Sequence, residues 1–190
     1  MAAPQLKAAD IHIRPAAHAE IPALNTLIEL SVRGLQKGDY TPEQIEGALQ
    51  TVFGVDTQLV SDGTYLVAEA RSTRNERVIV GCGGWSKRKT LYGADHWSHR
   101  QDDLLDPRMD AAKIRAFFIH PDFARRRVGT LLLQACEDAA RTAGFTRFEM
   151  GATLTGAKLF AARGYVALEQ LSIPLVNGAK LPIIHMEKCA

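Results

Sequence analysis

The sequence has few cysteines, no long apolar run and almost no net charge, and each absence excludes a class of protein. Its three cysteines, Cys82, Cys136 and Cys189, lack the spacing of a metal or redox site, which argues against a disulfide scaffold and favours a reducing cytoplasm. No stretch approaches the roughly 18 apolar residues of a membrane span, and no apolar run follows the first residues as in an export signal. Lys and Arg number 23 against 21 Asp and Glu, a net charge of +2 with no global field toward nucleic acid. Any anion site must therefore be local.

The composition is that of an ordinary globular domain. The chain has 190 residues, of which 46% are hydrophobic and 23% charged, with 15 glycines and 8 prolines, so collagen-like and disordered classes are excluded. At about 150 residues per domain, this length predicts one domain with an enlarged loop. No repeat, linker or low-complexity tract marks a boundary. We therefore expect a single domain over residues 1–190, with its core at about 11–188.

Hydrophobic periodicity and capping residues predict the order βααββ, a long loop, then βαβαββ. Apolar residues recur at helical spacing from Ala19 to Leu35, and Thr41-Pro42 with Gln44 forms a helix start with a capping box. Asn177-Gly178 between two apolar runs is typical of a hairpin turn. The predicted elements are a strand at 11–15, helices at 19–35 and 41–53, a strand hairpin at 65–70 and 78–85, a central strand at 112–120, a helix at 128–143, a strand at 146–150, a helix at 155–163 and two final strands.

The segment from Ser86 to Asp110 has neither a helical nor a strand period. A loop of this length inside a compact domain is usually functional or mobile, so we expect its contents to decide the substrate. Its acidic residues would suit a cationic substrate, although loops are commonly charged; these are Asp102, Asp103, Asp106 and Asp110.

One strand-to-helix turn carries the clearest chemical signal. The strand Phe117-Phe118-Ile119 is halted at Pro121, and residues 124–130, Ala-Arg-Arg-Arg-Val-Gly-Thr, lead into the long helix. Backbone N–H groups at a helix start, together with the helix dipole, form an anion pocket. Cations at a helix N-terminus cost roughly 0.3–1 kcal/mol, so three arginines there favour a bound anion over a merely solvated charge run. The ligand predicted is a phosphate or pyrophosphate.

These residues resemble the GNAT superfamily of acyl-CoA-dependent N-acyltransferases. The resemblance is carried by the strand Phe117–Ile119, by the turn at 124–130 and by the element order from Ile11 to Lys188. Residues 159–165, Leu-Phe-Ala-Ala-Arg-Gly-Tyr, are similar to the family's short helix near the thioester. The stretches CGGW, TLYG, LLDP and ATL resemble an uncharacterised bacterial branch of small members. The resemblance implies an α/β (α+β) fold with a mixed, mostly antiparallel central sheet flanked by helices.

The resemblance also implies where acetyl-CoA binds as a cosubstrate, with no metal. The strand would pair through its backbone with the pantetheine arm, and the turn would wrap the pyrophosphate. Two residues depart from the family pattern, since Ala124 replaces Gln or Arg and Arg127 replaces the first Gly. A left-handed backbone at Arg127 would cost about 1–2 kcal/mol. The implied cofactor-binding residues are Phe117, Phe118, Ile119, Arg125, Arg126, Arg127, Val128, Gly129, Thr130 and Phe160.

The catalytic groups are less defined by the sequence. Phe160 stands where many family members have a tyrosine that protonates the leaving thiolate. A thiol of pKa about 8.5 is a tolerable leaving group without that acid, whereas an alkyl amine of pKa about 10.4 must lose a proton before attack. Candidate bases are Glu149, Glu69 and His120, each with a structural alternative as an ion-pair partner or a strand-end residue. Direct attack with water as the proton acceptor is a further alternative.

The resulting hypothesis is an acyltransferase that moves an acetyl group from acetyl-CoA to a primary amine of a small molecule or peptide in a ternary complex. Backbone amides of the strand 117–119 would meet the oxyanion. One alternative is a CoA-binding sensor without turnover. Another is a nucleic-acid binder that uses the basic turn. We expect a cytoplasmic protein with no nucleic-acid or membrane partner. The sequence leaves its oligomeric state open, with a homodimer as the state that is common in families that resemble it.

Overall fold

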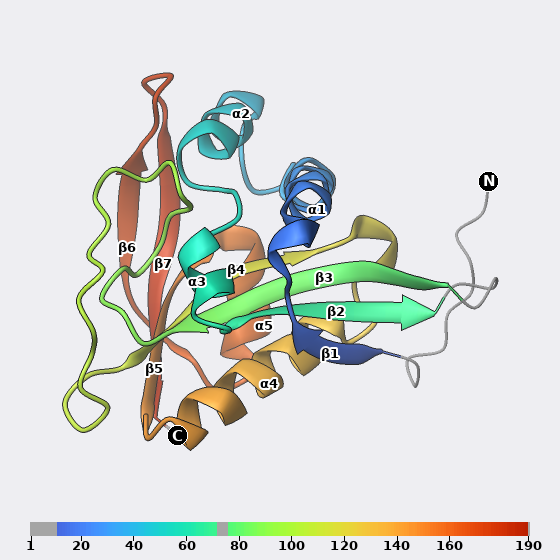
Figure 1. The fold of residues 1–190 in the computed structure, drawn as a ribbon. Coiled ribbons are helices and arrows are strands. Elements are labelled where there is room, and N and C mark those ends of the chain that lie inside the picture. The colour runs from blue at the N-terminus through green and yellow to red at the C-terminus, as the bar shows by residue number, and fades with distance from the viewer. Residues whose placement is uncertain (1–10, 72–75, 190) are drawn as a thin grey trace.

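The computed structural model describes residues 11–71 and 76–189, which build one seven-stranded sheet (Figure 1). The sheet order is β1-β2-β3-β4-β5-β7-β6. All neighbouring strands run antiparallel except β4 and β5, which are parallel. This arrangement confirms the predicted mixed, mostly antiparallel sheet. The strands are β1 (His12–Pro15), β2 (Tyr65–Arg71), β3 (Arg77–Ser86), β4 (Ala112–Ile119), β5 (Arg147–Thr153), β6 (Val166–Pro174) and β7 (Lys180–Cys189).

Helices cover both faces of the sheet. Helices α1 (Ile21–Leu35), α2 (Pro42–Thr51) and α3 (Thr57–Ser61) lie on one side in Figure 1, and α4 (Val128–Thr142) lies on the other. Their apolar stripes form two core clusters, the first containing Leu24 and Leu59 and the second containing Leu132. Phe160 of α5 (Leu154–Ala161) joins the second cluster. The predicted capping box of α2 is confirmed, because Thr41 and Gln44 exchange hydrogen bonds of 3.3 and 3.0 Å.

The two central strands diverge and open the sheet. β4 and β5 pair only at Ala112 with Phe148 and at Lys113 with Glu149. Beyond that point the pairing of β4 with β3 is also irregular, with a register shift between Cys82 and Gly84. β4 therefore presents a free edge toward its C-terminal end, which is where a ligand can reach the backbone.

The prediction missed some short elements. Helix α3, whose first turn is capped by the Asp56 side chain through the Gln58 N–H at 3.1 Å, was not expected, and neither were the 3₁₀ turns His18–Glu20 and Pro121–Phe123. The predicted loop 86–110 contains one isolated bridge, between Arg88 and Leu104. The polar connection expected between the hairpin strands lies partly outside the described residues, at 72–75. Residues 1–10, expected to carry no export signal, also lie outside them.

Within the described part of the chain, no helix combines the length and the apolar character needed to cross a membrane.

Candidate active site

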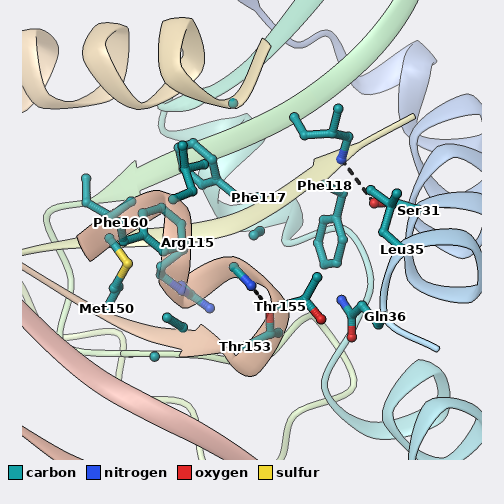
Figure 2. Close-up of a pocket in the computed structure, with 18 of the residues that line it drawn as sticks. Ser31, Leu35, Gln36, Arg115, Phe117, Phe118, Met150, Thr153, Thr155 and Phe160 are labelled. Carbon is teal, nitrogen blue, oxygen red and sulfur yellow. Dashed lines mark hydrogen bonds between the residues drawn. The ribbon is translucent and has the colours of Figure 1, made fainter. Parts of the chain in front are cut away.

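A cavity of about 670 Å³ occupies the opening between β4 and β5. Its wall combines the end of α1, the C-terminal half of β4, the turn before α4, the start of α5 and the segment 91–93 of the long loop. Figure 2 shows Phe118 of β4 beside Ser31 and Leu35 of α1, Phe117 closer to Phe160 of α5, and Thr153 and Thr155 below them. The topology therefore converts the free edge of β4 into a continuous cleft.

The backbone of β4 is distorted where the cavity begins. Ala116 has a φ of 57°, a left-handed conformation that an L residue with a side chain rarely adopts. Its carbonyl accepts a hydrogen bond from the Tyr65 hydroxyl at 3.2 Å, which holds the distorted peptide in place. Strain of this kind concentrates at functional sites.

Successive backbone amides at the end of β4 point to opposite edges of the strand. The Ile119 N–H donates to Ser31 Oγ at 3.0 Å, on the α1 side, whereas the next amide, of His120, donates to Val80 of β3 at 2.9 Å. By the two-residue alternation of a strand, the N–H of Phe117 lies on the same edge as that of Ile119. β4 thus offers backbone donors along the cavity.

The turn before α4 has the conformation of an anion-binding loop. Arg125 and Arg127 both have left-handed φ values, of 62° and 67°. Arg127 occupies the N-cap position of α4 with no side-chain capping bond, so the first-turn amides are available to a ligand. The φ of Arg127 accounts for the glycine that the family pattern places there. Of the cofactor-binding residues predicted in this turn, Arg125, Arg127, Val128, Gly129 and Thr130 line the cavity.

Two of the predicted cofactor residues have other surroundings than expected. Arg126 is not among the lining residues, and its guanidinium lies over the Phe123 ring at 5.6 Å. A Cβ at Gly129 would lie 2.9 Å from Leu159 Cδ2 of α5, so a larger residue would displace the Leu159 side chain. The glycine therefore allows α5 to close against the first turn of α4.

Phe160 lies at the inner end of the cavity and is buried. Its ring makes edge-to-face contacts with Phe117 at 5.8 Å and with Tyr165 at 5.9 Å. The hydroxyl of Tyr165 donates to Glu137 Oε1 at 3.0 Å and does not line the cavity. An aromatic hydroxyl next to Phe160 is thus already engaged in a buried hydrogen bond.

The three predicted bases all lie outside the residues that line the cavity. Glu149 is in the paired part of β5, bonded to Lys113 and to His185 Nε2, the latter at 2.8 Å. His120 Nδ1 accepts the N–H of Asp122 at 3.2 Å.

Glu69 of β2 is held by two arginines from the neighbouring strands, Arg14 of β1 and Arg77 of β3. It accepts hydrogen bonds from Arg14 Nη2 at 2.6 Å and from Arg77 Nη1 at 3.2 Å. These partners, Arg14 first, keep the pKa of the Glu69 carboxyl below its usual value. None of the three predicted bases therefore lines the cavity.

Sequence reasoning missed the carboxylate that does line the cavity. Asp39 follows α1, and its Oδ2 accepts the Thr155 hydroxyl of α5 at 2.7 Å. Nothing in its local sequence, Gly-Asp-Tyr after a helix end, distinguishes it from a surface turn residue. Asp39 lines the cavity because α5 packs against the end of α1, and the local sequence does not predict this contact.

The long loop contributes Leu91, Tyr92 and Gly93 to the cavity, and burial raises the pKa of the Tyr92 hydroxyl. Its acidic residues do not line the cavity. They are engaged elsewhere, Asp103 by Lys89 at 3.5 Å and Asp106 by Arg108 at 3.3 Å. They therefore give no support to a cationic substrate.

The comparisons with known proteins agree with this geometry. Residues 30–165 match the model of the acetyltransferase (GNAT) family. The chain belongs to this family. No curated protein matches the chain. Among the described residues, no group of three or more His, Cys, Asp or Glu side chains is placed to hold a metal ion.

Solved GNAT structures share the fold along the whole chain. A GCN5-related N-acetyltransferase from Rhodopseudomonas palustris is 25% identical, with a TM-score of 0.67 over 100% of this chain and 98% of that one. The PaiA N-acetyltransferase of Thermoplasma acidophilum, in complex with coenzyme A, is 14% identical, with a TM-score of 0.61 over 95% and 99%. YncA of Salmonella typhimurium, a putative acetyltransferase with acetyl-CoA, is 17% identical, with a TM-score of 0.58 over 95% and 94%.

Proposed function

We propose that this GNAT protein transfers an acetyl group from acetyl-CoA to a primary amine of a small molecule or peptide, by direct attack in a ternary complex. The observation that carries the proposal is the single cavity, which runs from the left-handed turn at Arg127 along the free edge of β4 to Phe160. Structures of the same fold contain coenzyme A or acetyl-CoA. Acetyl-CoA bound at one end of the cavity and the amine bound at the other would fit this shape.

The residues of the turn suit a pyrophosphate. Val128, Gly129 and Thr130 would supply first-turn amides at the positive end of the α4 dipole. Arg125, Arg127 and Lys158 line the same cavity and add positive charge, which phosphate oxygens accept as charge-assisted hydrogen bonds. The pantetheine arm would lie along the edge formed by the Phe117 and Ile119 amides.

The chemical step requires an oxyanion donor and a path for the two protons that an ammonium nitrogen loses when it becomes an amide. The amine nitrogen bonds to the thioester carbon, the C–S bond breaks, and the electron pair leaves on sulfur. We assign the Phe117 N–H, next to the distorted Ala116 peptide, to the developing oxyanion. Phe160 supplies no proton, and a thiolate of pKa about 8.5 leaves without one.

We assign the proton of the attacking amine to Asp39, directly or through water. Asp39 is the acidic residue among those that line the cavity, whereas Glu149, Glu69 and His120 lie outside it. The carboxylate is held by Thr155 at 2.7 Å, so its position is fixed relative to α5. At pH 7 an amine of pKa about 10.4 is almost entirely protonated, so Asp39 accepts the ammonium proton before attack, and the departing thiolate takes the second proton as the amide forms.

The test combines binding and turnover. Acetyl-CoA is expected to raise the Tm of the protein, and an amine panel with a free-thiol assay is expected to show CoA release above hydrolysis. Binding without amine-dependent release would instead identify a sensor domain. Absence of stabilisation by CoA, with steeply salt-dependent RNA or DNA binding, would contradict the proposal. A cytoplasmic location, a bacterial source and a homodimer stay predictions.

A further inference from the structure

Two buried polar atoms that line the cavity have no hydrogen-bond partner. Among the described residues, the buried side-chain atoms without one are Gln36 Oε1, Asp56 Oδ2 and Arg115 Nε. Asp56 Oδ2 lies 2.7 Å from Arg115 Nη1, so an ion pair accounts for it. Gln36 and Arg115 both line the cavity, one presenting an acceptor and the other a donor. Buried polar groups are rarely left unmet, so these two atoms indicate a polar ligand.

Arg115 is fixed in place, and one of its guanidinium nitrogens has no partner. It precedes the distorted Ala116 on β4, and its side chain is only 3% exposed. Nη1 is paired with Asp56 and Nη2 donates to the Gly93 carbonyl, whereas the Nε–H has no acceptor. Figure 2 shows the Arg115 side chain extending among the residues that line the cavity. Because its other contacts lock the guanidinium, the Nε–H has a defined direction.

The charges around Arg115 leave a buried positive excess. Asp56, 1% exposed, also pairs with Arg100 Nη2 at 3.0 Å, so two cations share one buried carboxylate. The other acids near Arg100 are Asp95 at 3.7 Å and Asp102 at 3.6 Å, with exposed fractions of 41% and 57%. Solvent screens those two far more than it screens Asp56. An anionic group in the cavity would complete the cluster.

The remaining walls on this side are apolar. The end of α1, the segment after α2, the long loop, β4 and β7 contribute Leu35, Val52, Phe53, Leu91, Phe118 and Ile183. Such walls bind a hydrocarbon or aromatic body by burying its surface. They offer little to a long chain bearing several charges.

We propose that the acceptor is an amine that carries a carboxylate next to the reacting nitrogen, on a compact apolar body, and that Arg115 Nε–H binds this carboxylate. The proposal rests on the proposed function, since it names the substrate class of the same site. Arg115 is one residue from the strand distortion that positions the oxyanion donor. An amine and a carboxylate attached to the same carbon can therefore reach the thioester and Arg115 together. Gln36 Oε1 would accept an N–H of a bound substrate.

The first experiment compares matched amines. L-Phenylalanine is compared with phenethylamine and L-phenylalaninamide, and L-leucine with isopentylamine, with rates corrected to the fraction of neutral amine. A site discriminates strongly against a substrate that leaves its buried donor without an acceptor. We therefore expect kcat/KM to be about 10- to 100-fold higher for each amino acid than for its analogue without the carboxylate. Equal values within each pair would overturn the proposal.

Variants then assign the preference to Arg115. Arg115→Lys keeps the charge and loses the Nε donor, and is expected to raise the KM for L-phenylalanine about tenfold more than it raises the KM for phenethylamine, which has no carboxylate to bind. Arg115→Gln is combined with Asp56→Asn, so that no carboxylate is left unpaired. Arg100→Gln is the matched control, because Arg100 touches Asp56 but does not line the cavity. An Arg115 variant that keeps the carboxylate preference, with its CoA-induced Tm shift intact, would overturn the assignment.

A binding measurement separates this proposal from the proposed function. CoA-loaded protein is titrated calorimetrically with L-phenylalanine and with phenethylamine, which needs no turnover. Tighter binding of the amino acid without acetyl transfer would support the carboxylate site and contradict the transferase. Transfer without a preference, or binding of neither compound, would overturn the carboxylate site.

Discussion

Ser31 of α1 accepts the backbone N–H of Ile119 on β4 at 3.0 Å, on the edge that faces the cavity. The Ser31 hydroxyl thus accepts a backbone N–H that the pantetheine arm would need. Because Ser31 is buried, its hydroxyl and the pantetheine arm compete for this N–H. This contact links the stability of the free protein to cofactor affinity.

We predict that Ser31→Ala lowers the free energy of unfolding by about 1–2 kcal/mol, because the Ile119 N–H loses its partner. The same substitution should increase the affinity for CoA a few-fold, since no hydroxyl has to be displaced. Denaturant unfolding and calorimetric titration with CoA measure the two effects. Thr26→Ala is the control, because Thr26 bonds only within α1, to Pro22 at 3.1 Å. Loss of CoA affinity in Ser31→Ala would show that the serine supports the bound strand instead.

The left-handed backbone of Arg127 predicts opposite effects on folding and binding. Arg127→Gly and Arg127→Ala both remove the guanidinium, but only glycine accepts a φ of 67° without strain. The glycine variant should therefore be about 1 kcal/mol more stable than the alanine variant. Both should bind CoA about tenfold more weakly as one charge-assisted phosphate contact is lost. Equal stabilities would mean that the turn relaxes away from the left-handed conformation, and unchanged CoA affinity would remove Arg127 from the site.

The turn and β4 were predictable because their signals are local. A strand stopped by Pro121 and followed by arginines and Gly129 contains its own anion-binding backbone, whatever the rest of the chain does. The acceptor side has no such signal, since Gln36, Tyr92 and Arg115 come from distant segments. One sign was present in the sequence, since the mostly apolar strand Ala112–Ile119 contains the charged residues Lys113 and Arg115, and a buried charge indicates a partner or a ligand.

Register explains why the predicted bases fall outside the cavity. Glu149 was placed near the point where the central strands separate, and it lies on β5 opposite Lys113, in the last pair before they separate. Because Glu149 belongs to the second of the two residue pairs that join β4 and β5, its carboxylate forms an ion pair and does not line the cavity. A sequence pattern predicts strands but not the residue at which two of them separate.

Glu69 is expected to affect acid stability and not catalysis. Arg14 holds the pKa of the Glu69 carboxyl below its unfolded value, so its contribution is present above about pH 4.3 and is lost as the pH falls below that. Glu69→Gln should lower the free energy of unfolding by about 1–2 kcal/mol at pH 7 and converge with the parent near pH 3. Urea unfolding across this pH range measures the effect. A loss of acetyl transfer beyond that explained by unfolding would make Glu69 a catalytic residue after all.

Asp39 is expected to set the pH dependence of the reaction. A general base contributes about 10²- to 10⁴-fold, so Asp39→Asn should reduce kcat at pH 7 by at least about a hundredfold while acetyl-CoA binding is retained. The difference should shrink as the pH approaches the amine pKa of about 10.4, because the neutral amine then no longer needs a base. Glu149→Gln is the matched control, since that carboxylate is outside the cavity. If Glu149→Gln lost activity and Asp39→Asn did not, the proton would leave on the β5 side of the opening. If neither variant lost activity, water alone would accept the proton of the amine. The role of Asp39 would then be structural, through its hydrogen bond with Thr155, which joins α5 to the end of α1.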